Sequence, residues 1–145
     1  MGNGSGQTLI ESIVATLLVV LLVTGLISGT TASLRAGQSG RDRSQANKYA
    51  QEGIEMTRNL RNAGWYPFFA QRDNIWCLAK DNVWPGSPAS GVADCDRNID
   101  NLFGRSVSFS WDNPRTRMVV VSTVRWFDGS TTHASTLTTY FTQWR

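Results

Sequence analysis

The N-terminal part of the chain contains one long apolar run. No charged residue occurs from Ser12 to Leu34, and the stretch from Ile13 to Ile27 is almost wholly aliphatic. A helix over this run would be roughly 34 Å long at ~1.5 Å per residue, which is enough to cross the hydrocarbon core of a bilayer. The pattern predicts a membrane-spanning helix, because the remaining chain is too short to enclose a helix that is apolar on all sides.

After Leu34 the pattern changes to that of an amphipathic helix. Apolar and small residues recur there at intervals of three and four, and no proline occurs before Pro67. This spacing predicts that the helix continues over residues 35–64, stops at Gly64, and packs one stripe on a sheet. The stripe consists of Ala46, Tyr49, Ala50, Gly53, Ile54, Met56, Leu60 and Ala63.

The C-terminal part alternates between apolar and polar residues, as strands do. Alternating segments occur at Arg105 to Trp111, Met118 to Phe127 and Thr132 to Phe141, and the last two are joined by the turn sequence DGST. These segments predict three antiparallel strands. Residues 65–104 are rich in proline, glycine and acids, which is typical of a loop region. The expected fold is α+β, with a C-terminal head over residues 65–145.

The composition of the chain limits the kinds of binding and catalytic site that are expected. The chain has 145 residues, a net charge of +3 and no cluster of cations, so a nucleic-acid surface is not expected. His133 is the only histidine and is expected to be a solvated strand residue, so the sequence predicts no enzyme and no cofactor. The acids of residues 93–100 alternate as calcium ligands could, but the twelve-residue calcium loop is absent. We therefore expect a solvated acidic loop and no metal site.

The two cysteines raise a question of compartment. Cys77 and Cys95 either form a disulfide or are two free buried thiols, since one distant histidine cannot complete a metal site. A disulfide requires a head outside the cytoplasm. The basic residues that follow the apolar run would instead keep the head in the cytoplasm under the positive-inside rule. These residues are Arg35, Arg41, Arg43 and Lys48.

Glu11 is the unusual residue of the N-terminal region, because it places a carboxylate at the edge of the apolar run. A secretory signal peptide would carry basic residues there, and Thr30 to Ser33 is only a loose match to a cleavage site. A plain single-span anchor and a buried core helix leave the carboxylate unexplained. An ionised acid in the bilayer costs on the order of 2 to 3 kcal/mol toward the centre, so it is expected to have a partner.

The sequence from Gly6 to Val20 resembles the N-terminus of type IV pilins and pseudopilins, the prepilin-type motif for cleavage and methylation. In that family a leader ends in glycine, prepilin peptidase cuts after it, and a glutamate is the fifth residue after the cut. The matching positions are Gly6, Thr8, Leu9, Ile10 and Glu11. The chain departs from the pattern at Gln7, where the family usually has an N-methylated phenylalanine, and in a leader without lysine or arginine.

The resemblance implies a fold and a function. It implies a type IV pilin ladle, with leader 1–6, membrane and filament-core helix 7–34, amphipathic helix 35–64 and a small sheet with a disulfide-closed loop. Gly6 and Gln7 would form the processing site. Thr8 and Glu11 would serve assembly, with Glu11 neutralising the Gln7 amine of a neighbouring subunit.

The implied protein is a structural subunit of a type IV pilus or a type II secretion pseudopilus. Its partners would be other pilin subunits, prepilin peptidase, the assembly machinery and, before assembly, the membrane. The precursor would lie in the cytoplasmic membrane with its head outside, and the assembled subunit in a pilus or pseudopilus at the cell surface. The pattern around Trp126 favours a minor pilin or pseudopilin. The alternative is a single-span anchor with a head that binds a surface, sugar or DNA without forming filaments.

Overall fold

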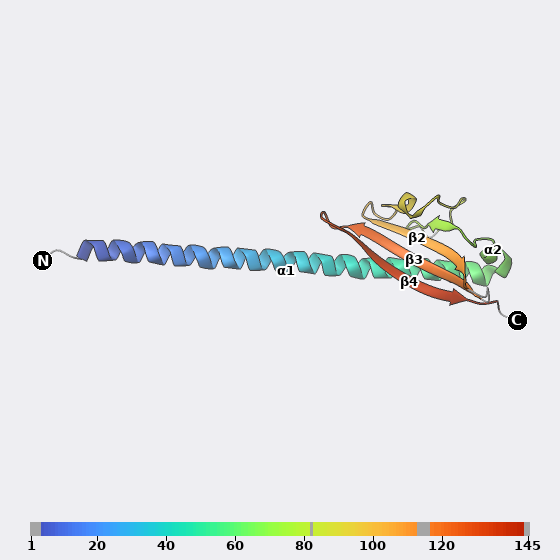
Figure 1. The fold of residues 1–145 in the computed structure, drawn as a ribbon, viewed down its shortest axis with the longest axis horizontal. Coiled ribbons are helices and arrows are strands. Elements are labelled where there is room, and N and C mark those ends of the chain that lie inside the picture. The colour runs from blue at the N-terminus through green and yellow to red at the C-terminus, as the bar shows by residue number, and fades with distance from the viewer. Residues whose placement is uncertain (1–3, 82, 113–116, 144–145) are drawn as a thin grey trace. The chain divides into compact units, whose positions relative to one another are not determined.

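The computed structural model describes residues 4–81, 83–112 and 117–143, with side chains from Thr8 onward. The chain divides into two units, residues 1–40 and residues 41–145. The first is helical throughout its described part, and the second contains the sheet (Figure 1). The elements in order are α1 (Gly4–Ala63), α2 (Trp65–Phe69), β1 (Ile75–Cys77), the 3-10 helix η1 (Val92–Cys95), β2 (Phe103–Trp111), β3 (Met118–Phe127) and β4 (Thr132–Phe141).

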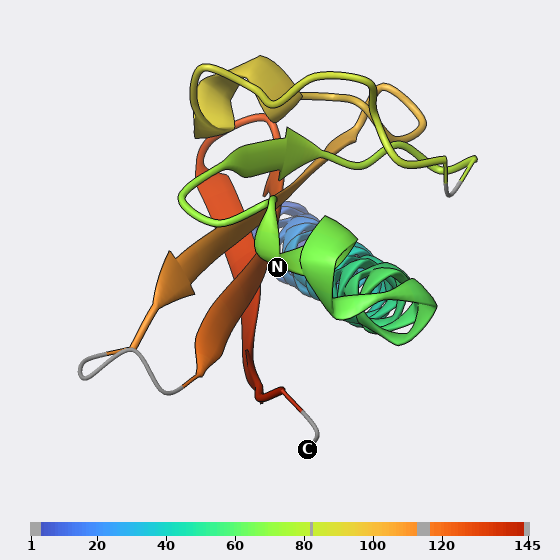
Figure 2. The same cartoon turned by 90° about the vertical axis from the view of Figure 1, so that its right-hand side faces the viewer.

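The sheet of the second unit is antiparallel, with its four strands in the order β1-β2-β3-β4. In the end-on view of Figure 2, β1 lies to one side of the helix and the other strands follow around it. The predicted bounds of β3 and β4 are confirmed, and β2 begins two residues before the predicted Arg105. The predicted hairpin is also confirmed: Asp128 accepts the Ser130 and Thr131 N–H groups, and Gly129 has a φ of 95°.

The region 65–104 is more ordered than the sequence predicts. It contains α2, β1 and η1, where only a loop was expected. The strand β1 has just three residues, too few for a period to be recognised. It forms because the edge of β2 offers backbone partners, as in the pairing of Trp76 with Val107. Directly after β1, the Leu78 N–H donates to the Arg105 carbonyl at 3.2 Å.

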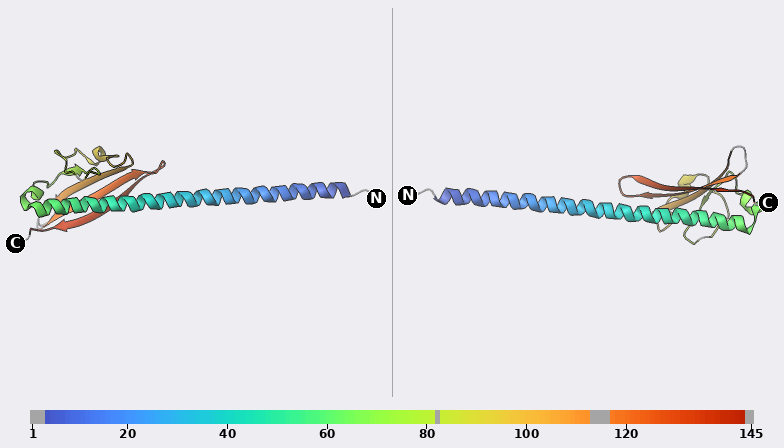
Figure 3. Two further views of the ribbon diagram at one scale, coloured as in Figure 1. Left: turned by 180° about the vertical axis from the view of Figure 1, so that it is seen from behind. Right: turned by 90° about the horizontal axis from the view of Figure 1, so that it is seen from below.

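The core of the second unit lies between the sheet and residues 41–63 of α1, which run along it (Figure 3). Most of the predicted helical stripe is confirmed as buried, while Met56 and Leu60 are half-buried and Ala63 is exposed. The predicted helix end is confirmed too, because α1 ends at Ala63. The buried members of the stripe are Ala46, Tyr49, Ala50, Gly53 and Ile54.

A buried arginine connects three elements of the core. The Arg105 side chain, on β2, has no exposed surface. Its guanidinium donates to the carbonyl oxygens of Leu78 (3.0 Å), Ala79 and Tyr49 (3.1 Å), and it lies 3.3 Å from a carboxylate oxygen of Glu52. Burial lowers the pKa of Arg105, and the charge of Glu52 opposes that shift. The charge is thus retained by acceptors from the helix and from the segment after β1.

Gly53 marks the closest approach of helix and sheet. A Cβ atom on this residue would lie 2.5 Å from Ser122 Oγ and 3.3 Å from Val107 Cγ2. Ser122 Oγ is itself buried and has no hydrogen-bond partner in the part of the chain that the structure describes. Gly53 and Ser122 therefore set the spacing between α1 and the centre of the sheet, because neither a larger residue nor a water molecule fits between these two residues.

Replacement of Gly53 by alanine should destabilise the second unit by about 1–3 kcal/mol, since the new methyl group forces the helix away from β3. Urea unfolding followed by tryptophan fluorescence measures this, because all six tryptophans follow Gly64. Adding Ser122→Gly should restore part of the loss. The control is Gly86→Ala, whose Cβ would meet nothing within 4 Å. Equal stability of Gly53→Ala and Gly86→Ala would contradict the close approach.

Candidate functional site

The first unit exposes apolar side chains around the whole circumference of its helix. Their exposed fractions run from 48% at Val23 to 75% at Leu34. The most apolar window of α1 has a mean hydropathy of 2.5, and none of that window is buried. By length and composition this helix is able to cross a membrane. The exposed apolar surface consists of Leu9, Ile10, Ile13, Val14, Leu17, Leu18, Val19, Val20, Leu21, Leu22, Val23, Leu26, Ile27 and Leu34.

Five hydroxyl groups in this surface are satisfied within the helix itself. Each of the five donates to a backbone carbonyl three or four residues earlier, as Thr24 does to Val20 at 2.7 Å. Such bonds remove the need for a water partner, so the hydroxyls are compatible with a hydrocarbon environment. The residues that make these bonds are Ser12, Thr16, Thr24, Thr30 and Thr31.

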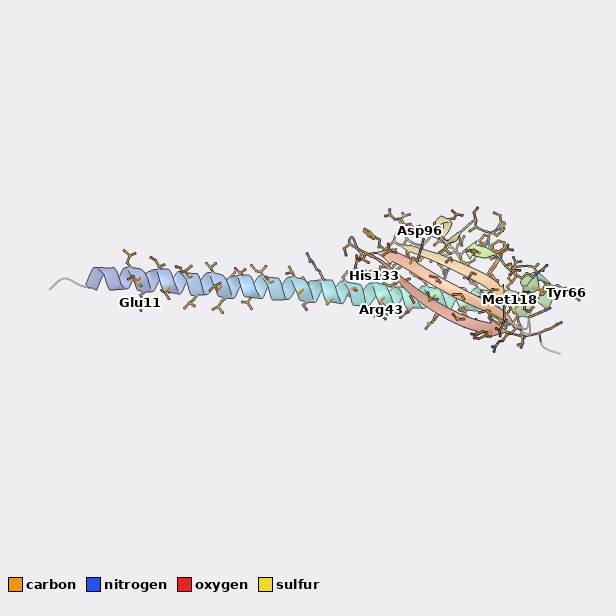
Figure 4. The ribbon with its side chains drawn as sticks, viewed as in Figure 1. Glu11, Arg43, Tyr66, Asp96, Met118 and His133 are labelled. Carbon is orange, nitrogen blue, oxygen red and sulfur yellow. A yellow bond between two sulfur atoms is a disulfide. The ribbon has the colours of Figure 1, made fainter. Side chains whose placement is uncertain are left out.

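Glu11 lies in the same exposed surface (Figure 4). Its carboxylate has no hydrogen-bond or ion-pair partner among the residues that the structure describes. One turn earlier, the Thr8 carbonyl accepts the Ser12 hydroxyl at 2.8 Å. The backbone of Gly6 and Gln7 is helical, whereas the Gln7 side chain and residues 1–3 of the predicted leader lie outside the described part. Within the described residues, the Glu11 carboxylate is therefore exposed and has no partner.

The predicted disulfide is present between Cys77 and Cys95, with a sulfur–sulfur distance of 2.09 Å. The alternative of two free thiols is wrong for this structure. The bond joins the end of β1 to the end of η1, and Cys95 is 1% exposed. Closing a segment of this length raises the free energy of the unfolded chain by ~3 kcal/mol, because it restricts the conformations of that chain. The disulfide thereby fixes the segment that carries Leu78 and Ala79, two acceptors of the Arg105 guanidinium.

The acids and the asparagine of residues 93–100 do not converge on a cation site. Among the described residues, no group of three or more histidine, cysteine or acidic side chains could hold a metal ion. Each acid has a partner within the chain, and the bond with Lys80 is the main cause that lowers the pKa of Asp100. The pairs are Asp94 with the Ser90 and Gly91 N–H groups, Asp96 with Arg125, Asn98 with the Arg105 backbone, and Asp100 with Lys80 and Tyr49.

His133 is a strand residue, as the sequence predicts, and its side chain is 39% exposed. The sequence did not predict its contacts: it stacks on Trp126 with ring centroids 5.4 Å apart, and its Nε2 lies 2.6 Å from a carboxylate oxygen of Asp128. The Thr131 N–H group and then His133 lower the pKa of Asp128. A predicted pairing of β3 with β4 would have placed His133 opposite Trp126. It would not have predicted that the turn brings Asp128 back to His133.

Two further features were missed by sequence reasoning. Arg105 has the same parity along β2 as Val107 and Phe109, so strict alternation would have placed it on the buried face. A groove of about 650 Å³ runs along α1 beside Trp84, which no local pattern encodes because its walls come from distant segments. The groove is lined by Lys48, Gln51, Glu52, Glu55, Met56, Asn59, Leu60, Ala63 and Trp84.

Comparisons of the chain with protein families, with curated proteins and with solved structures find no match.

The disulfide state is directly measurable because the chain has only two cysteines. In protein taken from producing cells, a maleimide should label neither Cys77 nor Cys95 before reduction and both after reduction under denaturing conditions. The reduced chain should unfold at a lower urea concentration. Its free energy of unfolding should be lower by the ~3 kcal/mol expected for a closed segment of this length. Labelling of both thiols without reductant would show that the head faces a reducing compartment.

Proposed function

We propose that the chain is a structural subunit of a type IV pilus or a secretion pseudopilus, assembled through its N-terminal helix. The observation that supports this proposal is the carboxylate of Glu11, which is exposed on an apolar helix without a partner in the described chain. Its distance in sequence from Gly6 matches the prepilin-type motif. A monomeric anchor would leave that charge uncompensated near the bilayer edge.

Cleavage after Gly6 would create the missing partner. The new amine on Gln7 lies about four residues before Glu11, or roughly 6 Å along a helix. An incoming subunit would place its Glu11 against the amine of a subunit already assembled. In a water-poor filament core such a pair selects one axial register, because any other register leaves two desolvated charges apart.

The second unit fits a head outside the cytoplasm. Its disulfide favours an oxidising compartment, whereas the basic residues after Leu34 favour the opposite orientation. Prepilins resolve this conflict because their short leader stays in the cytoplasm and the head follows the helix outward. The small sheet supports a minor pilin or a pseudopilin over a major subunit.

Processing is the first test of this proposal. In cells that contain prepilin peptidase, the mature protein should begin at Gln7, and intact-mass spectrometry should show the loss of residues 1–6. The variant Gly6→Val should accumulate as full-length precursor, since a branched side chain occupies the cut position. Gly4→Ala, two residues away, is the matched control and should be processed normally. An intact Met1 in the wild type would favour the anchored binding head that forms no filament.

Assembly is the second test. Glu11→Val should insert into the membrane normally but enter sheared filaments at least ten-fold less, because loss of one member of a desolvated ion pair costs about 2–5 kcal/mol. Glu11→Gln should behave like Glu11→Val if the charge is required. Ser12→Ala removes a hydroxyl bonded within its own helix and serves as control. Normal incorporation of both Glu11 variants would exclude the salt-bridge role.

A further inference from the structure

A small pocket lies between the segment that follows η1 and the β3–β4 hairpin. Its volume is about 240 Å³. All of its lining residues belong to the second unit, so it depends neither on the membrane helix nor on the proposed assembly. We call it the arginine pocket, and its walls include Asp96, Arg97, Leu102, Arg125, Trp126 and Phe127.

Arg97 is the unusual residue of this pocket. Its side chain is exposed, and its guanidinium has no hydrogen-bond or ion-pair partner among the residues that the structure describes. Its backbone has a φ of 56°, in the left-handed region that glycine adopts readily and other residues avoid. The arginine thus strains the backbone without a contact in the described chain that offsets the strain. Residues of this kind cluster at ligand sites.

The backbone of Arg97 is held in a fixed position. A Cβ atom on Gly104 would lie 3.2 Å from the Arg97 nitrogen, so this segment lies directly on β2. The next residue, Asn98, accepts the Arg105 N–H at 2.8 Å and donates to the Arg105 carbonyl at 3.1 Å. The disulfide at Cys95 restricts the same segment from the other side. The Arg97 side chain therefore starts from a rigid base, as a binding residue requires.

Arg125 supplies the second guanidinium from β3. Its side chain is half-buried, and its Nη2 donates to a carboxylate oxygen of Asp96 and, at 3.4 Å, to the Val92 carbonyl. The other two nitrogen atoms of this guanidinium have no acceptor among the described residues. Asp96 thus orients Arg125 and leaves donors available in the pocket.

The charges of the arginine pocket favour a ligand with a single negative charge. Two guanidinium groups and one carboxylate line it, which gives a net charge of +1. A carboxylate matches this charge and accepts two parallel N–H bonds from one guanidinium. A phosphate dianion would instead place excess negative charge beside Asp96, and like charges brought together are unfavourable.

The pocket also has apolar walls. Leu102 is 41% exposed and Phe127 is 48% exposed, although both are large apolar side chains. Ligand pockets combine such apolar surface with a few polar groups that fix the orientation of the ligand. The combination here indicates a ligand with an apolar group next to its anion.

We propose that the arginine pocket binds a carboxylate attached to an apolar group. Such a group occurs in a small organic acid and at the C-terminus of a polypeptide that ends in an apolar residue. Arg97 and Arg125 would donate to the carboxylate, while Leu102 and Phe127 would contact the apolar part. Asp96 would keep Arg125 oriented and disfavour anions of higher charge.

The full-length chain in detergent micelles provides the test, with N-acetylphenylalanine as the probe. Calorimetry should show saturable binding. The matching amide, N-acetylphenylalaninamide, should bind about ten-fold more weakly or less, because the hydrogen bonds to a charged group are lost. Inorganic phosphate at the same concentration should not displace the probe. An acetylated tetrapeptide that ends in phenylalanine separates the two sources: tighter binding indicates a polypeptide C-terminus, and equal binding a small acid.

Arg97→Gly separates binding from folding. It should weaken binding of the probe by about ten-fold or more. It should also unfold at the same or a higher urea concentration, because glycine relieves the left-handed backbone. Asp73→Gly is the matched control, since Asp73 has a φ of 62° and does not line the pocket. Arg58→Gln controls for net charge, because it removes a cation from the exposed surface of α1. Both controls should bind like the wild type.

Several results would overturn the proposal. One is no saturable binding by the wild type, or equal binding of the acid and its amide. Another is displacement of the probe by phosphate, which would exclude the carboxylate class. Unchanged binding by Arg97→Gly would remove Arg97 from the site, and lost binding together with unfolding at lower urea would give it a structural role. None of these results depends on Glu11 or on cleavage.

Discussion

The buried guanidinium of Arg105 is the interaction on which the second unit depends. Through Tyr49, Leu78 and Ala79, it joins β2 to the helix and to the segment after β1 by hydrogen bonds. A buried cation is tolerated only when its donors are all used, so these three segments must hold their positions together. The disulfide at Cys77 adds to this constraint, since it restricts the chain immediately before two of the acceptors.

The helix α1 has two regions whose surfaces differ in burial. Within residues 41–63 it buries a single stripe, and Gly53 lets it approach the sheet until Ser122 is in contact. From Leu9 to Leu34 its side chains are exposed, and five of its hydroxyl groups bond to carbonyls of the same helix. The proposed function follows from this contrast, because a surface of that kind is stable only in lipid or against other apolar helices.

Much of the candidate site could be predicted from the sequence. The apolar run and the position of Glu11 follow from composition and spacing along one segment. The sequence favoured the pairing of Cys77 with Cys95 but left two free thiols open, and the structure decides for the disulfide. The environment of His133 could not be predicted, because it depends on the turn that returns Asp128 to the strand. The position of β4 at the edge of the sheet was equally hidden, since a strand pattern does not say which strand lies outermost.

The helix, the three long strands, the hairpin and most of the stripe that packs on the sheet could be predicted from the pattern of residues alone. Periodicity carries that information because burial of one face repeats at every turn or every second residue. Three features became known only from the folded structure: β1 joins the sheet, Arg105 is fully buried, and the outer edge of β4 has no partner strand among the described residues. These features depend on contacts between residues far apart in the chain, which no local pattern of polar and apolar residues encodes.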